Sequence, residues 1–164
     1  MDRDETDGPD AITFPPLIYL AGLGLSLVGR LCFRTPIAPK WLSRQRRKTG
    51  IALIAAGVAT AIWGVRTFQE AGTNISVHQP ATALVERGPF RYSRNPIYIS
   101  MTAVYSGITL LLNNLWGFLL LPAVLAVVQR GVIEREEQHL RARFGDAYDD
   151  YTRRVPRWLR LPTR

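Results

Sequence analysis

The sequence has few residues that can form a cross-link or hold a metal ion. Its single cysteine, Cys32, excludes an internal disulfide. Its two histidines, His78 and His139, are isolated and have no metal-ligand spacing, so we expect no metal site. A nucleotide-binding fingerprint is also lacking, because the glycines of Gly22-x-Gly24 follow no strand and indicate close helix packing instead.

Charge is missing from three long stretches of the chain. Ala11–Gly29, Thr49–Val65 and Asn95–Gln129 contain no Asp, Glu, Lys or Arg. Helices with a water-facing side carry charged residues there, so these stretches do not fit a soluble domain. The third stretch, roughly 50 Å long if helical throughout, exceeds one membrane crossing and must fold back. The polar pair Asn113-Asn114 is the turn signal inside it.

The sequence therefore predicts an all-α integral membrane bundle of about four transmembrane helices, near residues 14–33, 50–68, 96–112 and 115–132. The last two form a hairpin. An amphipathic helical tail follows, in which Gly145 ends a helix as a C-cap. Three regions result: an acidic N-terminal tail (1–13), two membrane helices joined by a basic loop (14–68), and a C-terminal core (69–164).

The net charge of +8 suits either nucleic acid or anionic lipid headgroups. Beside membrane helices we expect the lipid bilayer as partner and no nucleic acid. Four crossings put the 69–95 loop and the C-terminal tail on one side and the 34–49 loop on the other. Both sides are basic, and the positive-inside rule favours the tail side as cytoplasmic.

Arginines gather before the third helix, in a connection rich in glycine, proline and turn formers. Arg91 and Arg94 precede Asn95-Pro96, where Asn suits a helix N-cap and Pro the first helical position. The free amides of a helix N-terminus already favour an anion. This pattern predicts a bound carboxylate or phosphate, and the alternative is contact with lipid headgroups.

A second polar feature follows the fourth helix. Glu137 shares one helical stripe with apolar residues, whereas Glu136 is predicted to point about 100° away. A carboxylate on an inward stripe is costly unless a cation meets it. The partner is either an arginine, in a salt bridge, or a bound cation or hydroxyl-rich cofactor. The apolar residues of the stripe are Ile133, Leu140 and Phe144.

Two motifs carry a resemblance to a known family. Residues 88–98 read Gly-Pro-Phe-Arg-Tyr-Ser-Arg-Asn-Pro-Ile-Tyr, and after a helical hairpin comes a second pattern. In this order the two resemble the isoprenylcysteine carboxyl methyltransferase family and its phospholipid methyltransferase relatives, over residues 84–158. The second pattern consists of Glu136-Glu137, Leu140, Phe144-Gly145, Tyr148, Tyr151 and Val155-Pro156-Arg157.

The resemblance implies a membrane-embedded methyltransferase that uses S-adenosylmethionine and releases S-adenosylhomocysteine. Residues 69–164 would be its catalytic core, with the cofactor between the two motifs and a lipophilic acceptor entering from the bilayer. Arg91 is a further candidate cofactor contact, because it belongs to the anion site predicted above. Tyr105 and Trp116 are candidates for the acceptor pocket. The implied cofactor contacts are Arg94, Asn95, Tyr98 and either Glu136 or Glu137.

One departure concerns the chemistry. Eukaryotic members usually read Arg-His-Pro where this chain has Arg94-Asn95-Pro96, and Asn cannot titrate. Methyl transfer to a nucleophilic acceptor asks mainly for in-line positioning, so we predict no general base.

The acceptor and the enzyme class stay open at the level of the sequence. Acceptors that fit are a prenylcysteine-like carboxylate, another lipid-like acid, thiol or amine, or the amine of phosphatidylethanolamine. The short chain favours a bacterial lipid-type acceptor and the bacterial inner membrane, with the cofactor site and C-terminus facing the cytoplasm. Two alternatives are an NADPH-dependent enzyme resembling sterol reductases and a non-catalytic lipid-binding scaffold.

Overall fold

The computed structural model describes residues 14–33, 35–72 and 83–159, and within them every regular element is helical. The predicted acidic tail 1–13 and His78 lie outside the described residues. The all-α prediction is confirmed. The elements are α1 (Pro15–Cys32), η1 (Lys40–Leu42), α2 (Ser43–Glu70), η2 (Gly88–Arg91), α3 (Pro96–Leu112), α4 (Leu115–Val128), the π-helical turn η3 (Gln129–Ile133), α5 (Glu134–Phe144) and α6 (Asp146–Arg154).

The apolar helices fit a membrane bundle. Three of them, Pro15–Cys32, Lys40–Glu70 and Leu115–Phe144, are long and apolar enough to cross a membrane, and α3 is a shorter apolar helix of 17 residues. Large apolar side chains on α1 and α2 are exposed, Leu20 and Ile62 among them. In a bilayer, hydrocarbon tails cover such surfaces. In water, an apolar surface of this kind would be unfavourable. The predicted helical membrane bundle is confirmed.

Two predicted helix boundaries were wrong. α2 begins at Ser43 rather than near residue 50, so basic residues assigned to a loop form its first turns. Arg46 there donates hydrogen bonds to the carbonyls of Leu110 and Leu111 at the end of α3. The fourth helix does not end near 132 but continues through η3 into α5, as far as Phe144. Charged residues are good helix formers outside the hydrocarbon layer, so loss of hydropathy alone does not end a helix.

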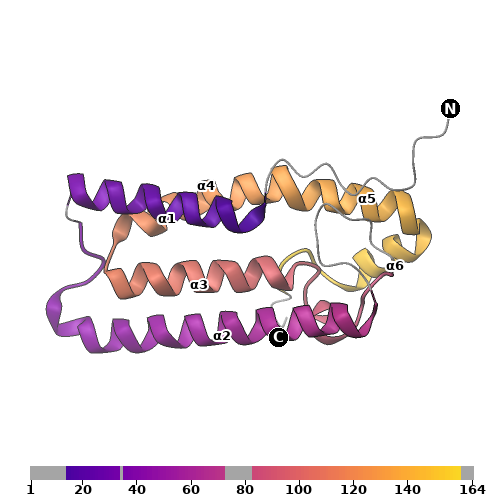
Figure 1. Ribbon diagram of the computed structural model, residues 1–164, viewed down its shortest axis with the longest axis horizontal. Helices are drawn as coiled ribbons and strands as arrows, with labels where there is room; N and C mark the ends of the chain where they lie inside the picture. The colour runs from indigo at the N-terminus through magenta and orange to yellow at the C-terminus, as the bar shows by residue number, and fades with distance from the viewer. Residues whose placement is uncertain (1–13, 34, 73–82, 160–164) are drawn as a thin grey trace.

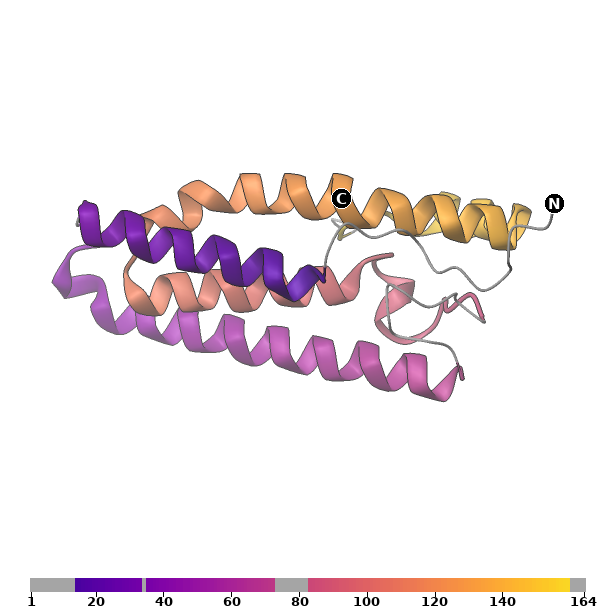
Figure 2. The same cartoon turned by 45° about the horizontal axis from the view of Figure 1, so that its top comes forward.

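The helices form two pairs (Figure 1). α2 packs along α3, and α1 packs along α4. Figure 2 shows the same arrangement from a second direction, with α1 lying over the α3–α4 side of the bundle. The α1–α2 connection and the α3–α4 turn lie at one end, whereas η2, α5 and α6 lie at the other. The residues of both sequence motifs are therefore at the same end.

Glycines bring α2 and α3 into close contact. Gly50, Gly57 and Gly64 recur every seventh residue on the buried face of α2. A Cβ added at Gly57 would lie 2.7 Å from the Ser100 carbonyl oxygen, and one at Gly107 would lie 2.6 Å from that of Gly50. Small residues let membrane helices approach this closely.

Polar residues join the α3–α4 turn to its neighbours. Asn113 has a left-handed backbone (φ 51°), and its Oδ1 accepts hydrogen bonds from the amides of Ile37 and Ala38 at 3.0 and 3.1 Å. Asn114 Nδ2 donates to the Ser26 carbonyl oxygen and hydroxyl on α1. The predicted turn at this pair is confirmed, and so is Gly145, which follows α5 at φ 51°.

Candidate functional site

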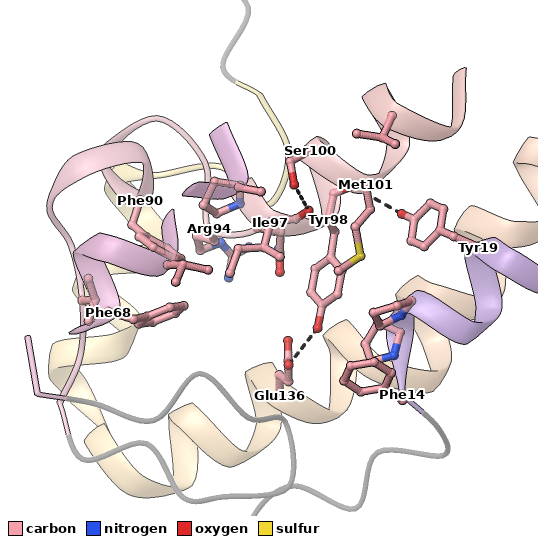
Figure 3. Close-up of a pocket in the computed structure, with 18 of the residues that line it drawn as sticks. Phe14, Tyr19, Phe68, Phe90, Arg94, Ile97, Tyr98, Ser100, Met101 and Glu136 are labelled. Carbon is pink, nitrogen blue, oxygen red and sulfur yellow. Dashed lines mark hydrogen bonds between the residues drawn. The ribbon is translucent and has the colours of Figure 1, made fainter. Parts of the chain in front are cut away.

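A cavity of about 700 Å³ opens at the end of the bundle that holds both motifs (Figure 3). Its walls come from α1, α2, α3, α5 and α6 and are mostly apolar, with a group of polar side chains at one end. This composition is typical of small-molecule sites, where a few polar groups orient an otherwise apolar ligand. The polar residues include Arg94, Asn95, Tyr98, Glu136, Glu137 and His139.

Arg94 lies between η2 and α3, and the backbone holds it against the C-terminal segment. Its amide donates to the Pro156 carbonyl at 3.0 Å. The side chain is only 14% exposed, and its Nη1 lies 3.1 Å from Glu137 Oε1 and 3.3 Å from the Tyr148 hydroxyl. Its Nε is buried and has no hydrogen-bond acceptor among the described residues. One donor of the guanidinium is thus available at the polar end of the cavity.

Glu137 lies between two guanidinium groups. Arg157 donates from Nη2 to Oε2 at 2.7 Å and from Nε to Oε1 at 3.0 Å, while Arg94 contacts the same carboxylate. Hydrogen bonding and the negative charge of Glu137 raise the pKa of Arg157. The salt-bridge alternative for Glu137 is therefore realised. Sequence reasoning missed the role of Arg157, although this residue closes the second motif.

Glu136 also faces the cavity, which differs from the prediction that it points away. The Tyr98 hydroxyl donates to its Oε1 at 2.8 Å (Figure 3). The prediction was wrong because the site surrounds α5 on two sides: α3 contacts Glu136, and the C-terminal segment contacts Glu137.

The protonation of Glu136 is perturbed. Glu136 lies in α5, the charged continuation of the fourth apolar helix. The apolar residues of that helix end at Ile133, so α5 lies outside the hydrocarbon layer. Burial is the main cause that raises the pKa of Glu136 to about 7; the Tyr98 hydrogen bond lowers this pKa and the charge of Glu137 raises it, and both effects are smaller. A carboxyl group with a perturbed pKa in a cavity is a marker of a functional site.

Asn95 occupies the predicted N-cap position, and Pro96 is the first residue of α3. The Asn95 side chain caps no amide, however, so the capping interpretation was wrong for the side chain. Its Nδ2 donates to the Arg157 carbonyl at 3.0 Å, and Ser93 Oγ donates to the same oxygen at 3.1 Å. The two side chains fasten the loop motif to the C-terminal segment.

Two residues singled out from the sequence lie away from the cavity. Arg91 is exposed in η2, where its guanidinium stacks over the Tyr92 ring at 5.2 Å. Trp116 lies at the opposite end of the bundle, beside Phe33 with ring centroids 6.0 Å apart. Tyr105 does line the cavity: it is buried, and its hydroxyl donates to the Gly117 carbonyl at 2.9 Å.

Two tyrosines of α6 complete the polar end. Tyr151 donates to the Phe90 carbonyl at 2.8 Å and thereby joins α6 to η2. Burial raises the pKa of both Tyr148 and Tyr151, so their hydroxyls stay neutral across the physiological range.

Comparison with known proteins agrees with this architecture. A family profile described as phospholipid methyltransferase matches residues 46–147. An uncharacterised protein from Haemophilus influenzae is 35% identical over 63 residues, which are 38% of this chain and the whole of that protein. No solved structure matches the chain. The matched range covers more than half of the chain and includes most of α2 and all of α3, α4 and α5. The chain therefore belongs to the phospholipid methyltransferase family and is a membrane methyltransferase.

Proposed function

We propose that this protein transfers a methyl group from S-adenosylmethionine to a lipophilic acceptor, with the cofactor bound at the polar end of the cavity. The observation that carries the proposal is the arrangement around Glu137. Arg94 and Arg157 contact its carboxylate, and Glu136 lies beside it at the end of an apolar cavity. Opposite charges from two distant segments thus meet at the end of an apolar cavity, which suits a reaction between a polar cofactor and an apolar acceptor.

The residues present fit the cofactor. It carries a carboxylate, an ammonium, a sulfonium and ribose hydroxyls. Arg94 has a buried Nε with no acceptor among the described residues, which suits the carboxylate. Glu136 receives a hydrogen bond from Tyr98, and its carboxylate suits a cation. A cavity of about 700 Å³ is within the range that small-molecule sites span. These fits support Arg94, Tyr98 and Glu136 as cofactor contacts, and we include Asn95 and Glu137 in the proposed cofactor-binding set because they hold the two motifs together beside them.

When bound, the cofactor supplies an electrophilic methyl group on its sulfonium. Toward this methyl group, the chain contributes positioning and exclusion of water. Tyr98 orients the Glu136 carboxylate, and Asn95 keeps the loop motif against the C-terminal segment. The apolar walls keep water from the reacting atoms, which strengthens the electrostatic contacts inside.

The acceptor binds along the apolar part of the cavity. Side chains of α1, α2 and α3 line this part, including Leu20, Ile62 and Met101. Two of these, Leu20 and Ile62, are also exposed, so the cavity is open along this apolar wall, where a bilayer would supply lipid. A hydrocarbon chain fits such a wall. The reacting group is a carboxylate, thiol or amine, including an amine of the phosphatidylethanolamine type, and the site faces the cytoplasm of a bacterial inner membrane.

Calorimetric titration of the purified protein in detergent tests the cofactor. S-adenosylhomocysteine should bind the wild type, and Glu136→Gln should weaken it at least tenfold by removing the negative charge. Glu86→Gln is the matched control, because Glu86 pairs with Arg154 outside this cavity. Binding of NADPH instead would favour the reductase alternative, and binding of neither would favour the scaffold.

A labelling experiment identifies the acceptor. Membranes that contain the protein are incubated with methyl-labelled S-adenosylmethionine, and the lipids are extracted and separated. Label in a lipid is expected with the wild type and not with Glu136→Gln. Equal labelling with both would contradict the assignment of Glu136.

A further inference from the structure

His139 is a titratable residue of the cavity that the cofactor contacts do not use. It lies on α5 three residues after Glu136, a spacing that puts both side chains on one face of the helix. Both residues line the cavity. The His139 Nε2 atom is buried and has no hydrogen-bond partner among the described residues. A buried polar atom without a partner is costly, and a ligand in the cavity would supply one.

The surrounding charged and titratable groups are mostly paired. On α5, Glu137 is held by arginines and Glu136 by Tyr98. The hydroxyls of three tyrosines have protein hydrogen-bond partners: Tyr19 contacts Tyr98 and Thr102 on α3, Tyr105 donates to Gly117, and Tyr151 of α6 donates to Phe90. Tyr148 contacts Arg94 of the loop motif. His139 is thus the cavity imidazole whose Nε2 is available to a ligand.

We propose that His139 Nε2 accepts the proton that the acceptor loses during methyl transfer, so that the acceptor reacts through a nitrogen or sulfur that carries a proton. This inference rests on the proposed function. The sulfonium carbon–sulfur bond breaks, and its electron pair stays on the sulfur of S-adenosylhomocysteine. A bond forms between the methyl carbon and the acceptor atom, whose proton moves to Nε2. Imidazole and acceptor proton together become imidazolium, so charge and atoms balance.

The position of Glu136 one turn before His139 suits this role. The unprotonated nitrogen of a neutral imidazole is the group that accepts a proton in general base catalysis. The imidazolium that forms would lie on the same helix face as the Glu136 carboxylate, and opposite charges at this spacing attract. A carboxylate acceptor would gain nothing from His139, because it has no proton to lose.

Turnover of probe acceptors by variants tests the inference. Dodecylamine, dodecanethiol and dodecanoate are supplied in detergent with saturating labelled S-adenosylmethionine, so that the pH dependence of cofactor binding does not enter. His139→Gln should lower methylation of the amine and thiol by about 10² to 10⁴ and remove the acid limb of the pH–rate profile. Gln138→Ala, at an exposed neighbouring position, is the control and should leave both unchanged. Unchanged turnover and profile in His139→Gln, or methylation of dodecanoate alone by the wild type, would overturn it.

Nuclear magnetic resonance gives a readout that needs no acceptor. The chain has only two histidines, so the His139→Gln spectrum assigns the His139 imidazole. In the S-adenosylhomocysteine complex above neutral pH, we expect Nδ1 to carry the proton and Nε2 to be free. A protonated Nε2 would overturn the inference even if no probe is methylated. If the wild type does not bind S-adenosylhomocysteine, the proposed function is overturned as well. If the wild type and His139→Gln both bind it and their turnover is the same, only the role of His139 is overturned.

Discussion

Glu137 and Arg157 form a bidentate ion pair, with contacts of 2.7 and 3.0 Å between residues twenty positions apart in the chain. The pair ties the segment after α6 back to α5. Because Arg94 contacts the same carboxylate, the loop motif joins the same network. The two motifs therefore depend on each other for their geometry.

Glu137→Gln should lower the stability of the protein. Removing the charge leaves the Arg94 guanidinium without this anion, at a site where the Arg94 and Glu137 side chains are each only 14% exposed, whereas Arg157 keeps the more distant Glu134, 3.8 Å away. We expect a loss of about 1–3 kcal/mol, below the full effect for deeply buried pairs because Arg157 is partly exposed. Thermal unfolding in detergent measures it. Asp150→Asn breaks an exposed pair with Arg153 and should change little; equal melting temperatures for the two variants would contradict the structural role of Glu137.

Binding of S-adenosylhomocysteine should strengthen as the pH rises from 6 to 8. Because burial raises the pKa of Glu136 to about 7, protons compete below that pH with the ammonium group of the ligand for this carboxylate. The affinity should change by up to about tenfold per pH unit below the pKa. Calorimetry at several pH values measures this, and Glu136→Gln should remove the trend whereas Glu86→Gln keeps it. The same trend in Glu136→Gln would assign it to another group.

The unliganded protein should show the opposite pH trend in stability. A raised carboxyl pKa means that the folded state holds the Glu136 proton more tightly than the unfolded chain does. This contribution is fully present below the ordinary carboxyl pKa of 4.5 and is lost as the pH rises through about 7. Glu136→Gln should therefore flatten the dependence of melting temperature on pH across this window. A parallel shift of the whole curve, with its slope unchanged, would refute the assignment.

Asn95→Ala should loosen the loop motif from the C-terminal segment. The variant loses the hydrogen bond to the Arg157 carbonyl, at a cost of about 1 kcal/mol. Ser93→Ala removes the other donor to that oxygen, and the double variant should lose more than either alone. Melting temperature and S-adenosylhomocysteine affinity should fall together. Full affinity in the double variant would show that this connection does not shape the site.

Gly57→Ala should separate α2 from α3. The added Cβ would lie 2.7 Å from the Ser100 carbonyl oxygen and 2.9 Å from Val104, so the helices must shift. We expect a destabilisation of about 1–3 kcal/mol. Gly24→Ala on α1 is the control, because its Cβ meets nothing within 4 Å and alanine is the better helix former. Thermal unfolding that ranks the two variants the other way would contradict the packing.

Topology reporters should place the two ends of the bundle on opposite sides of the membrane. The α1–α2 connection and α5 lie at opposite ends of the molecule (Figure 1). A reporter inserted after Pro39 and one fused after Arg164 should therefore give opposite signals, with the C-terminal one cytoplasmic. Signals from the same side would contradict the membrane topology.

Much of the fold follows from local patterns in the sequence. Runs without charge define the apolar helices, because an exposed charge in hydrocarbon is costly. Asn113 and Gly145 mark a turn and a helix end, because their backbones tolerate positive φ. The start of α2 at Ser43 and the continuation of the fourth helix past residue 132 into α5 did not follow, because a helix continues past the bilayer as readily as within it.

The sequence by itself determined that the chain is a helical membrane bundle with arginines before one helix and glutamates after another, since hydropathy and helical period are properties of neighbouring residues. Only the tertiary structure decided which charges meet. It paired Glu137 with Arg94 and Arg157, turned Glu136 toward Tyr98, and gave the Asn95 side chain to the Arg157 carbonyl rather than to a helix amide. These pairs join segments far apart in the chain, and their distances depend on how α3, α5 and the C-terminal segment pack together.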